Sequence, residues 1–343
     1  MITWLQKKQW KKGTTADETW AVREDTPETH QIKRGTPSMG GIGIITATLI
    51  PLSILPIYSL VIVLLRKQSL PASSELTSHL FTLNLVPLVL LSHGLLGFAD
   101  DWSKASGRGG LRARYKLIGQ MFLASAFVYS LIVLFLPRGA SLNYAFVELY
   151  GTHFELFVLV SVCLVLVIIT TCNAVNLTDG IDGLAAGLAM QCGIALFFIS
   201  SKSPGISSVS AWPIMALAGA CLGFLHFNKY KARVFMGDTG SLAIGAALGA
   251  GAILQGAVFL LPFIGFIYFV EMFSVIFQVA WFKWTKRKTG EGQRLFRRAP
   301  LHHHFELGGW SEWRVVGTFW AINLFTSAIG LWLWHAGVLP RWP

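Results

Sequence analysis

Long runs of apolar residues alternate with short polar segments from Ile42 to the end of the chain. A run of about 20 apolar residues can cross the hydrocarbon of a bilayer as a helix, which satisfies its own backbone hydrogen bonds there. The pattern therefore predicts an all-α, polytopic transmembrane helix bundle of about nine spans, the seventh and eighth dividing one stretch too long for a single crossing. The predicted spans are Ile42 to Leu65, Leu80 to Phe98, Leu117 to Leu136, Phe154 to Cys172, Leu184 to Ser201, Ala211 to Phe227, Leu242 to Gly256, Ala257 to Trp284 and Val315 to His335.

The composition excludes a soluble domain with a polar shell. Hydrophobic residues make up 53% of the chain and charged residues only 13%. We expect residues 1–41 to form a polar N-terminal segment and residues 42–343 to form a single integral-membrane domain. The four cysteines lie in or beside apolar runs without CxxC spacing, which indicates packing rather than metal binding.

Lysine and arginine residues collect in alternate loops of the predicted bundle. Most of the 28 lie in residues 1–41, 104–116, 229–233 and 286–314. The positive-inside rule places these segments in the cytoplasm and the C-terminus outside. Membrane insertion and anionic lipid account for the net charge of +11, so we expect a lipid bilayer as a partner and no nucleic acid. The loops on the other side carry Arg66, Lys67, Arg138, Lys202 and Arg341.

Five aspartates fall at three predicted helix ends on the cytoplasmic side. They are Asp100 and Asp101 in GFADDWSK, Asp179 and Asp182 in NLTDGIDG, and Asp238 in FMGDTGS. Because these ends face one side, helices far apart in the sequence can bring the carboxylates into one cleft, where their repulsion requires a cation. Hard oxygen ligands favour Mg²⁺. The alternative is that each aspartate caps a helix or marks a solvated turn.

Basic residues and glycines accompany these acids. Lys104 and Lys116 flank the first aspartate pair, and Lys229 and Lys231 precede FMGDTGS. Positive side chains, exposed backbone amides and a metal together suit a diphosphate, because its charge must be spread while a phosphorus is attacked.

The segment LHHHFE contains three consecutive histidines, His302, His303 and His304. Consecutive helical residues diverge by about 100°, so the run lacks the i, i+4 pairing of a helical zinc site, although a loop could present two of them. Zinc binding, a solvated run and hydrogen bonding to phosphate remain as interpretations, and we favour phosphate contact. The lone carboxylate within the apolar spans, Glu271, is either functional or hydrogen-bonded inside the bundle, and we leave it outside the predicted site.

Five spaced motifs resemble one known family. KRGTPSMGG, GFADDWSK, NAVNLTDGIDGLA, HFNKYKARVFMGDTGSLAIG and APLHHHFE, in this order, are similar to the motifs of the phospho-N-acetylmuramoyl-pentapeptide-transferases. The aspartate motifs are shared across the wider superfamily of polyprenyl-phosphate sugar-phosphate transferases, whereas LHHHFE is typical of the muramoyl-pentapeptide enzymes. The resemblance implies ten helices. No sufficiently long apolar run precedes KRGTPSMGG, so either the start of the sequence is truncated or misassigned, or this protein has nine helices.

The resemblance also implies a reaction in the bacterial cytoplasmic membrane. Undecaprenyl phosphate attacks the sugar-linked phosphate of UDP-MurNAc-pentapeptide, giving lipid I and UMP with Mg²⁺ as cofactor, in an enzyme that forms a homodimer. By this analogy Asp238 binds Mg²⁺, Asp100 and Asp101 lie near the lipid phosphate, and His302 joins these three as a catalytic residue. The implied substrate-binding residues are Lys104, Lys116, Asn176, Asp179, Asp182, Asn228, Phe235, His303 and His304.

Two other functions are weighed against this one. A polyprenyl-phosphate N-acetylglucosamine-1-phosphate transferase would share the aspartates but not LHHHFE. A membrane transporter would show inverted repeats and polar residues in the middle of its spans. Here no repeat is detected and the acids lie at helix ends, so a transferase is favoured over a transporter.

Overall fold

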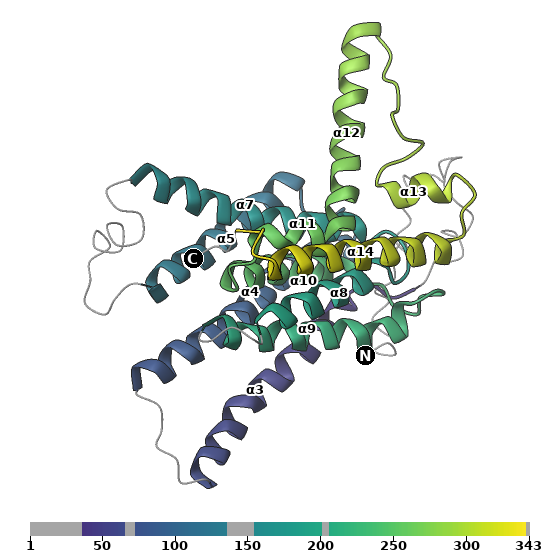
Figure 1. Ribbon diagram of the computed structural model, residues 1–343. Helices are drawn as coiled ribbons and strands as arrows, with labels where there is room; N and C mark the ends of the chain where they lie inside the picture. The colour runs from purple at the N-terminus through teal and green to yellow at the C-terminus, as the bar shows by residue number, and fades with distance from the viewer. Residues whose placement is uncertain (1–35, 66–72, 136–153, 201–205, 341–343) are drawn as a thin grey trace.

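A computed structural model describes residues 36–65, 73–135, 154–200 and 206–340, so most of the predicted N-terminal segment lies outside the described residues (Figure 1). The described part is helical and contains no β-strand, which confirms the prediction of an all-α protein. The helices are α3 Gly41–Leu65, α4 Ser73–Ala105, α5 Ala113–Phe135, α7 Phe154–Thr178, α8 Leu184–Ser200, α9 Ile206–Asn228, α10 Gly237–Leu254, η1 Val258–Leu260, α11 Leu261–Ile264, α12 Phe266–Thr289, α13 Leu301–Glu306 and α14 Glu312–His335.

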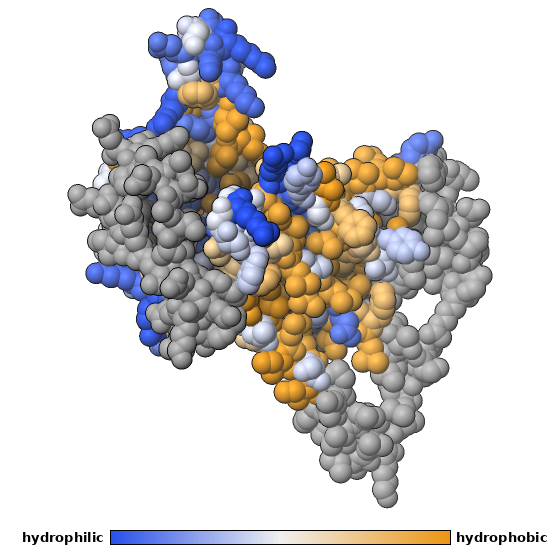
Figure 2. All heavy atoms as spheres, turned by 180° about the vertical axis from the view of Figure 1, so that it is seen from behind, coloured by the Kyte–Doolittle hydropathy of each residue, from blue (hydrophilic) through white to orange (hydrophobic). Residues whose placement is uncertain are grey.

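Seven of the described helices are long and apolar enough to cross a membrane, namely α4, α5, α7, α9, α10, α12 and α14. Two shorter apolar helices, Gly41–Ile54 within α3 and Leu184–Ser200, occupy the other predicted spans. Figure 2 shows apolar side chains over the middle of the visible face and hydrophilic ones gathered at the projecting end of the molecule. This distribution is that of a polytopic membrane protein, as the hydrophobic pattern predicts.

Helix α10 is the centre of the bundle. In the part of α10 that is long enough to cross a membrane, 89% of the residues are buried, whereas only 22% are buried in the corresponding parts of α7 and α12. Its sequence, GDTGSLAIGAALGAGAIL, is mostly glycine and alanine, so the neighbouring helices α4, α7 and α3 approach its backbone closely. At Gly97 of α4, an added Cβ would overlap the carbonyl of Asp238 in α10. The small residues thus bring the acidic ends of α4 and α10 together.

The long apolar stretch that begins in α10 is divided, as predicted, but into four helices rather than two. The short helices η1 and α11 follow α10, and the chain turns at Gly265 before α12 begins. A break inside a membrane leaves backbone groups that need partners. Asn323 of α14 supplies them, because its side-chain amide donates to the Ile264 carbonyl at 2.9 Å and its oxygen accepts from Ile267 N–H at 3.3 Å.

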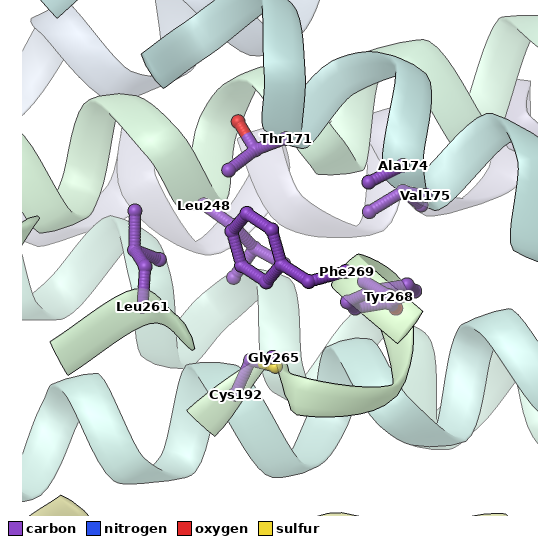
Figure 3. Close-up of a pocket in the computed structure, with 9 residues that line it drawn as sticks. All are labelled: Thr171, Ala174, Val175, Cys192, Leu248, Leu261, Gly265, Tyr268 and Phe269. Carbon is purple, nitrogen blue, oxygen red and sulfur yellow. The ribbon is translucent and has the colours of Figure 1, made fainter. Parts of the chain in front are cut away.

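Helix α12 projects from the bundle at a steep angle to α14, and α13 lies beside its base (Figure 1). Where α12 leaves the bundle, a cavity of about 20 Å³ lies between α7, α10 and α11. Figure 3 shows Phe269 of α12 extending across it and Leu261 at one side. The Thr171 hydroxyl is bonded to carbonyls of its own helix, so the cavity offers an apolar lining.

Candidate active site

Three of the five predicted aspartates converge where the end of α4 meets the beginning of α10. Asp100 and Asp101 lie in the last turns of α4, and Asp238 is the second residue of α10. One carboxylate oxygen of each lies within 4.8 Å of the others. Asp100 and Asp101 are buried and Asp238 is half-buried, so little water separates the three negative charges. Such a cluster requires nearby cations.

Two lysines supply positive charge to this cluster. Lys104 Nζ lies 2.6 Å from Asp100 Oδ2 and 3.0 Å from Asp238 Oδ2. Lys116 Nζ, from the first turn of α5, lies 2.6 Å from the same Asp238 oxygen. Asp100 Oδ1 in turn accepts a hydrogen bond from a backbone N–H in the loop that leads to α5. Three carboxylates therefore face two ammonium groups, which leaves one negative charge for a further cation.

Asn176 of α7 orients the carboxylate of Asp238. Its amide nitrogen donates to Asp238 Oδ1 at 3.0 Å and contacts Ser241 Oγ at 2.8 Å, while its oxygen lies 3.5 Å from Lys116 Nζ. The NAVNLTDG motif was expected to be a loop after a span ending at Cys172, but α7 continues to Thr178. The extra helical turns carry Asn176 to the cluster.

Asp101 caps the N-terminus of α10. Its Oδ1 accepts the Asp238 backbone N–H at 3.1 Å, and its Oδ2 accepts the N–H and hydroxyl of Thr239 at 2.9 and 2.7 Å. The first N–H groups of a helix lack partners within the helix, and a carboxylate there also interacts favourably with the helix dipole. The capping alternative considered for the aspartates thus applies to Asp101, which joins α4 to α10.

Asp182 and Asn228 join the segments that surround the cluster. Asp182 is buried, and its Oδ2 accepts the Ala232 N–H at 2.9 Å. Asn228 accepts the Gly183 N–H at 3.0 Å and donates to a carbonyl of the α9–α10 loop at 2.9 Å. These two predicted substrate-binding residues therefore hold the turn after α7 against the loop before α10.

Asp179 and Phe235 are both half-buried and lie on those same two segments. Asp179 follows the last residue of α7. The backbone of Phe235 pairs with the segment before α3, accepting from Gly40 N–H at 2.8 Å and donating to the Pro37 carbonyl at 2.9 Å. The KRGTPSMGG motif is thereby brought beside FMGDTGS.

The three histidines lie on the short helix α13, so the alternative in which a loop presents two of them is wrong. His302 is fully buried, whereas His303 and His304 are half-buried. His303 Nδ1 lies 2.8 Å from Glu306 Oε2, and His304 Nδ1 accepts the Arg297 N–H at 3.1 Å. Burial lowers the pKa of His303 to about 4, against the hydrogen bond with Glu306, which raises it.

Comparisons with known proteins show the family to which the chain belongs. Residues 83–256 match the family described as glycosyl transferase family 4. A phospho-N-acetylmuramoyl-pentapeptide-transferase of Heliobacterium modesticaldum is 42% identical over 313 residues, which are 91% of this chain and 87% of that protein. Proteins of the same name from Shouchella clausii and Geobacillus kaustophilus are 38% and 40% identical, each over 91% of this chain and 88% of the relative.

The chain belongs to the phospho-N-acetylmuramoyl-pentapeptide-transferase family. It is therefore a multi-pass bacterial membrane protein and a transferase, and the resemblance seen in the motifs is confirmed. The match to glycosyl transferase family 4 includes all five predicted aspartates.

The donor set of the aspartate cluster suits a hard divalent cation. Asp100, Asp101 and Asp238 offer only carboxylate oxygens, which Mg²⁺ prefers to histidine or thiolate ligands. The hydrogen bonds that Asp101 accepts hold both of its oxygens to the first residues of α10, whereas Asp100 and Asp238 face lysine side chains, which can exchange partners. Both also contact lysine, so a bound cation would share them with Lys104 and Lys116.

Two buried glutamates near this site were not included in the predicted set. Glu271 of α12 accepts the His302 N–H at 3.0 Å, and Glu312 of α14 accepts the Asp182 N–H at 2.7 Å. The position of Glu271 in the middle of an apolar span indicated a functional or bonded carboxylate. Its partner could not be identified from the sequence, because His302 is 31 residues away on α13. For Glu312 the only local signal was its position in the first turn of a helix.

Proposed function

We propose that the chain transfers phospho-N-acetylmuramoyl-pentapeptide from UDP-MurNAc-pentapeptide to undecaprenyl phosphate, giving lipid I and UMP, with Mg²⁺ as cofactor. The observation that carries the proposal is the cluster of Asp100, Asp101 and Asp238 with Lys104 and Lys116 at the ends of membrane-length helices. One substrate is a lipid with its phosphate at the membrane surface and the other is soluble. A site where helices emerge is accessible to both.

In the proposed reaction an oxygen of the lipid phosphate bonds to the sugar-linked phosphorus, and the bond from that phosphorus to the UMP oxygen breaks. Asp238 and Asp100 would hold Mg²⁺, which when bound spreads the negative charge of the diphosphate. Lys104 and Lys116 each have three donors and exchange carboxylate contacts for phosphate oxygens as substrate binds. Asn176 keeps the Asp238 carboxylate oriented meanwhile.

His303 and His304 offer the substrate opposite hydrogen-bonding groups. His304 Nδ1 accepts a backbone N–H, so its ring proton is on Nε2, which donates and suits a phosphate oxygen. His303 faces a carboxylate through Nδ1 and is neutral at pH 7 because of its lowered pKa, so its Nε2 accepts. An acceptor suits a hydroxyl or amide of the sugar-peptide. We assign phosphate contact to His304 and sugar contact to His303.

The nucleotide is assigned to the segments around Asp179 and Phe235. Phe235 is half-buried, and its ring can stack on uracil. Asp182 and Asn228 shape this region through the loops that they join. The charge distribution supports a site on the cytoplasmic side. A homodimer is proposed because the motif resemblance implies one. Residues 42–343 form one catalytic domain in this proposal.

Transfer of labelled sugar to polyprenyl phosphate tests the substrate pair. We expect a lipid-linked product from UDP-MurNAc-pentapeptide and none from UDP-GlcNAc, because the histidine helix has groups for the larger sugar-peptide. Comparable turnover of the two nucleotide sugars would contradict this specificity and leave only the general transferase activity.

The metal assignment is tested by Asp238→Asn. We expect turnover to fall by at least about a hundredfold, because neutralising the ligand weakens Mg²⁺ binding where diphosphate charge is stabilised. Raising Mg²⁺ should recover part of the lost rate. The exposed Glu155, at the other end of α7, provides the control Glu155→Gln, which should keep the wild-type metal response. An unchanged metal response in Asp238→Asn would contradict the assignment.

A further inference from the structure

Glu271 and His302 form a buried pair between α12 and α13. Both side chains are fully shielded from solvent. Glu271 Oε1 accepts the His302 backbone N–H at 3.0 Å, and Oε2 lies 3.3 Å from His302 Nδ1. His302 is the second residue of α13, so its N–H has no partner within the helix and is available to the carboxylate.

The pair fixes the position of one proton. Among the described residues, Glu271 Oε2 and both His302 ring nitrogens have no aligned hydrogen-bond partner. A buried polar atom left without a partner costs about 1–3 kcal/mol, and a slight ring rotation over 3.3 Å aligns Nδ1 with Oε2. A carboxylate only accepts, so the imidazole carries a proton on Nδ1 toward Glu271, and in the neutral ring Nε2 is then bare.

His302 Nε2 lies against the turn after α7. A Cβ built on Gly180 would overlap the imidazole at Nε2, so the ring occupies the space that the glycine leaves open. Gly180 lies between Asp179 and Asp182, and four residues before it Asn176 holds Asp238. The fully buried imidazole makes no hydrogen bond with the charged cluster, and it is connected to the cluster through its contact with this turn.

We propose that Glu271 is a positioning residue of the transferase site. It holds His302 with the proton on Nδ1 and the ring seated beneath Gly180, and this fixes the turn from Asp179 to Asp182. The proposal rests on the proposed transfer reaction for its kinetic readout. His302 in turn acts on the substrate through this turn rather than by touching it.

The test replaces Glu271 with glutamine. The glutamine carbonyl can still accept the His302 N–H, but its amide group faces Nδ1 and donates, which moves the ring proton to Nε2. We expect kcat to fall about 10- to 100-fold with a change in KM for UDP-MurNAc-pentapeptide below about threefold, the size typical of residues that orient catalytic groups. Glu155→Gln is the matched control and should behave as wild type.

The proton position is measured without turnover. The ¹⁵N NMR spectrum of histidine-labelled protein, with the His302 signal assigned by its loss in His302→Asn, should show Nδ1–H in the wild type and Nε2–H in Glu271→Gln. His302→Asn removes the ring that packs against Gly180 and should lose at least as much kcat as Glu271→Gln. A wild-type signal with Nδ1 bare, or wild-type kcat in Glu271→Gln, would overturn the proposal.

Gly180→Ala provides a second variant in case Glu271→Gln does not fold. The added methyl displaces the His302 ring but leaves Glu271 unchanged, so we expect a comparable loss of kcat. Wild-type kcat in Gly180→Ala would also overturn the proposal. If the wild type transfers no sugar phosphate, the proposed function fails, whereas the NMR result still decides the proton position.

Discussion

Asp238 is the residue through which the charged side chains of the site are connected. Its Oδ1 accepts from Asn176, and its Oδ2 contacts both Lys104 and Lys116. A cation and two lysines therefore compete for one carboxylate. Changes at the lysines and at Asp238 should consequently alter metal dependence in different directions.

Replacing Lys116 with methionine tests this competition. We expect kcat to fall about a hundredfold because a donor to phosphate is lost. The Mg²⁺ concentration that gives half-maximal activity should not rise, because a competing cation beside Asp238 has been removed. Lys288→Met, at the exposed end of α12, should leave both quantities unchanged. A raised Mg²⁺ requirement in Lys116→Met would show that the lysine assists metal binding.

His303 should make the folded protein sensitive to mild acid. Its pKa is lowered to about 4 in the folded state by burial, from 6.5, so the unfolded chain binds more protons between these values. Stability is then lost as pH falls through this range, by about 2 kcal/mol between pH 7 and pH 5. Thermal unfolding in detergent should show a smaller pH effect in His303→Gln, whereas the exposed His335→Gln should match the wild type. Equal pH effects in His303→Gln and wild type would contradict this.

At the scale of the elements, two helix ends are completed by side chains from other helices. Asp101 of α4 accepts the first N–H groups of α10. Asn323 of α14 bonds the backbone on both sides of the break between α11 and α12 and donates to Gln191 of α8 at 3.0 Å. The direction in which α12 leaves the bundle therefore depends on α14.

Asn323→Leu should destabilise the protein by about 1–3 kcal/mol, because the backbone at the break and Gln191 lose their partner in a region without water. Leu324→Ala, on the exposed face of the same helix, should change stability by less than about 0.5 kcal/mol. Thermal unfolding of the two variants in one detergent compares them. Equal stabilities would show that the break is held by packing alone.

For the whole molecule, sidedness follows from the distribution of lysine and arginine. The charged cluster, α13 and the basic end of α12 all belong to segments that the positive-inside rule assigns to the cytoplasm. The same rule predicts that Glu155, at the beginning of α7, lies on the opposite side.

Cysteines introduced at Ser106 and Glu291 should resist a membrane-impermeant thiol reagent in intact cells, and one at Glu155 should react. All three positions are exposed. The background should carry Cys163→Ala, because Cys163 is exposed while the other three cysteines are buried. Labelling at Ser106 or Glu291 from outside would reverse the assigned orientation.

The spans and the positions of the acids were predictable because they depend on residues near in sequence. A run of apolar residues is long enough to cross a bilayer whatever surrounds it, and among the described residues each of the nine predicted spans contains a helix. The boundaries were less accurate, since α7 continues past the predicted Cys172 to Thr178 and carries polar Asn176 into the bundle. Tertiary partners for Asn176, namely Asp238 and Ser241, stabilise those polar turns.

The sequence by itself determined that this is a polytopic membrane protein and which family the motifs resemble, and it predicts which side of the membrane carries the acids. Only the tertiary structure decided that Asp101 caps α10, that Asp238 meets two lysines, and that His302 is buried against Gly180 and Glu271. The reason is physical. Apolar length and loop charge act through the solvent and the bilayer, whereas the role of a polar side chain depends on its partner, and Lys104 and Asp238 are 134 residues apart. The partner is set by helix packing, because the small residues of α10 let α4 approach closely enough for Lys104 to contact Asp238.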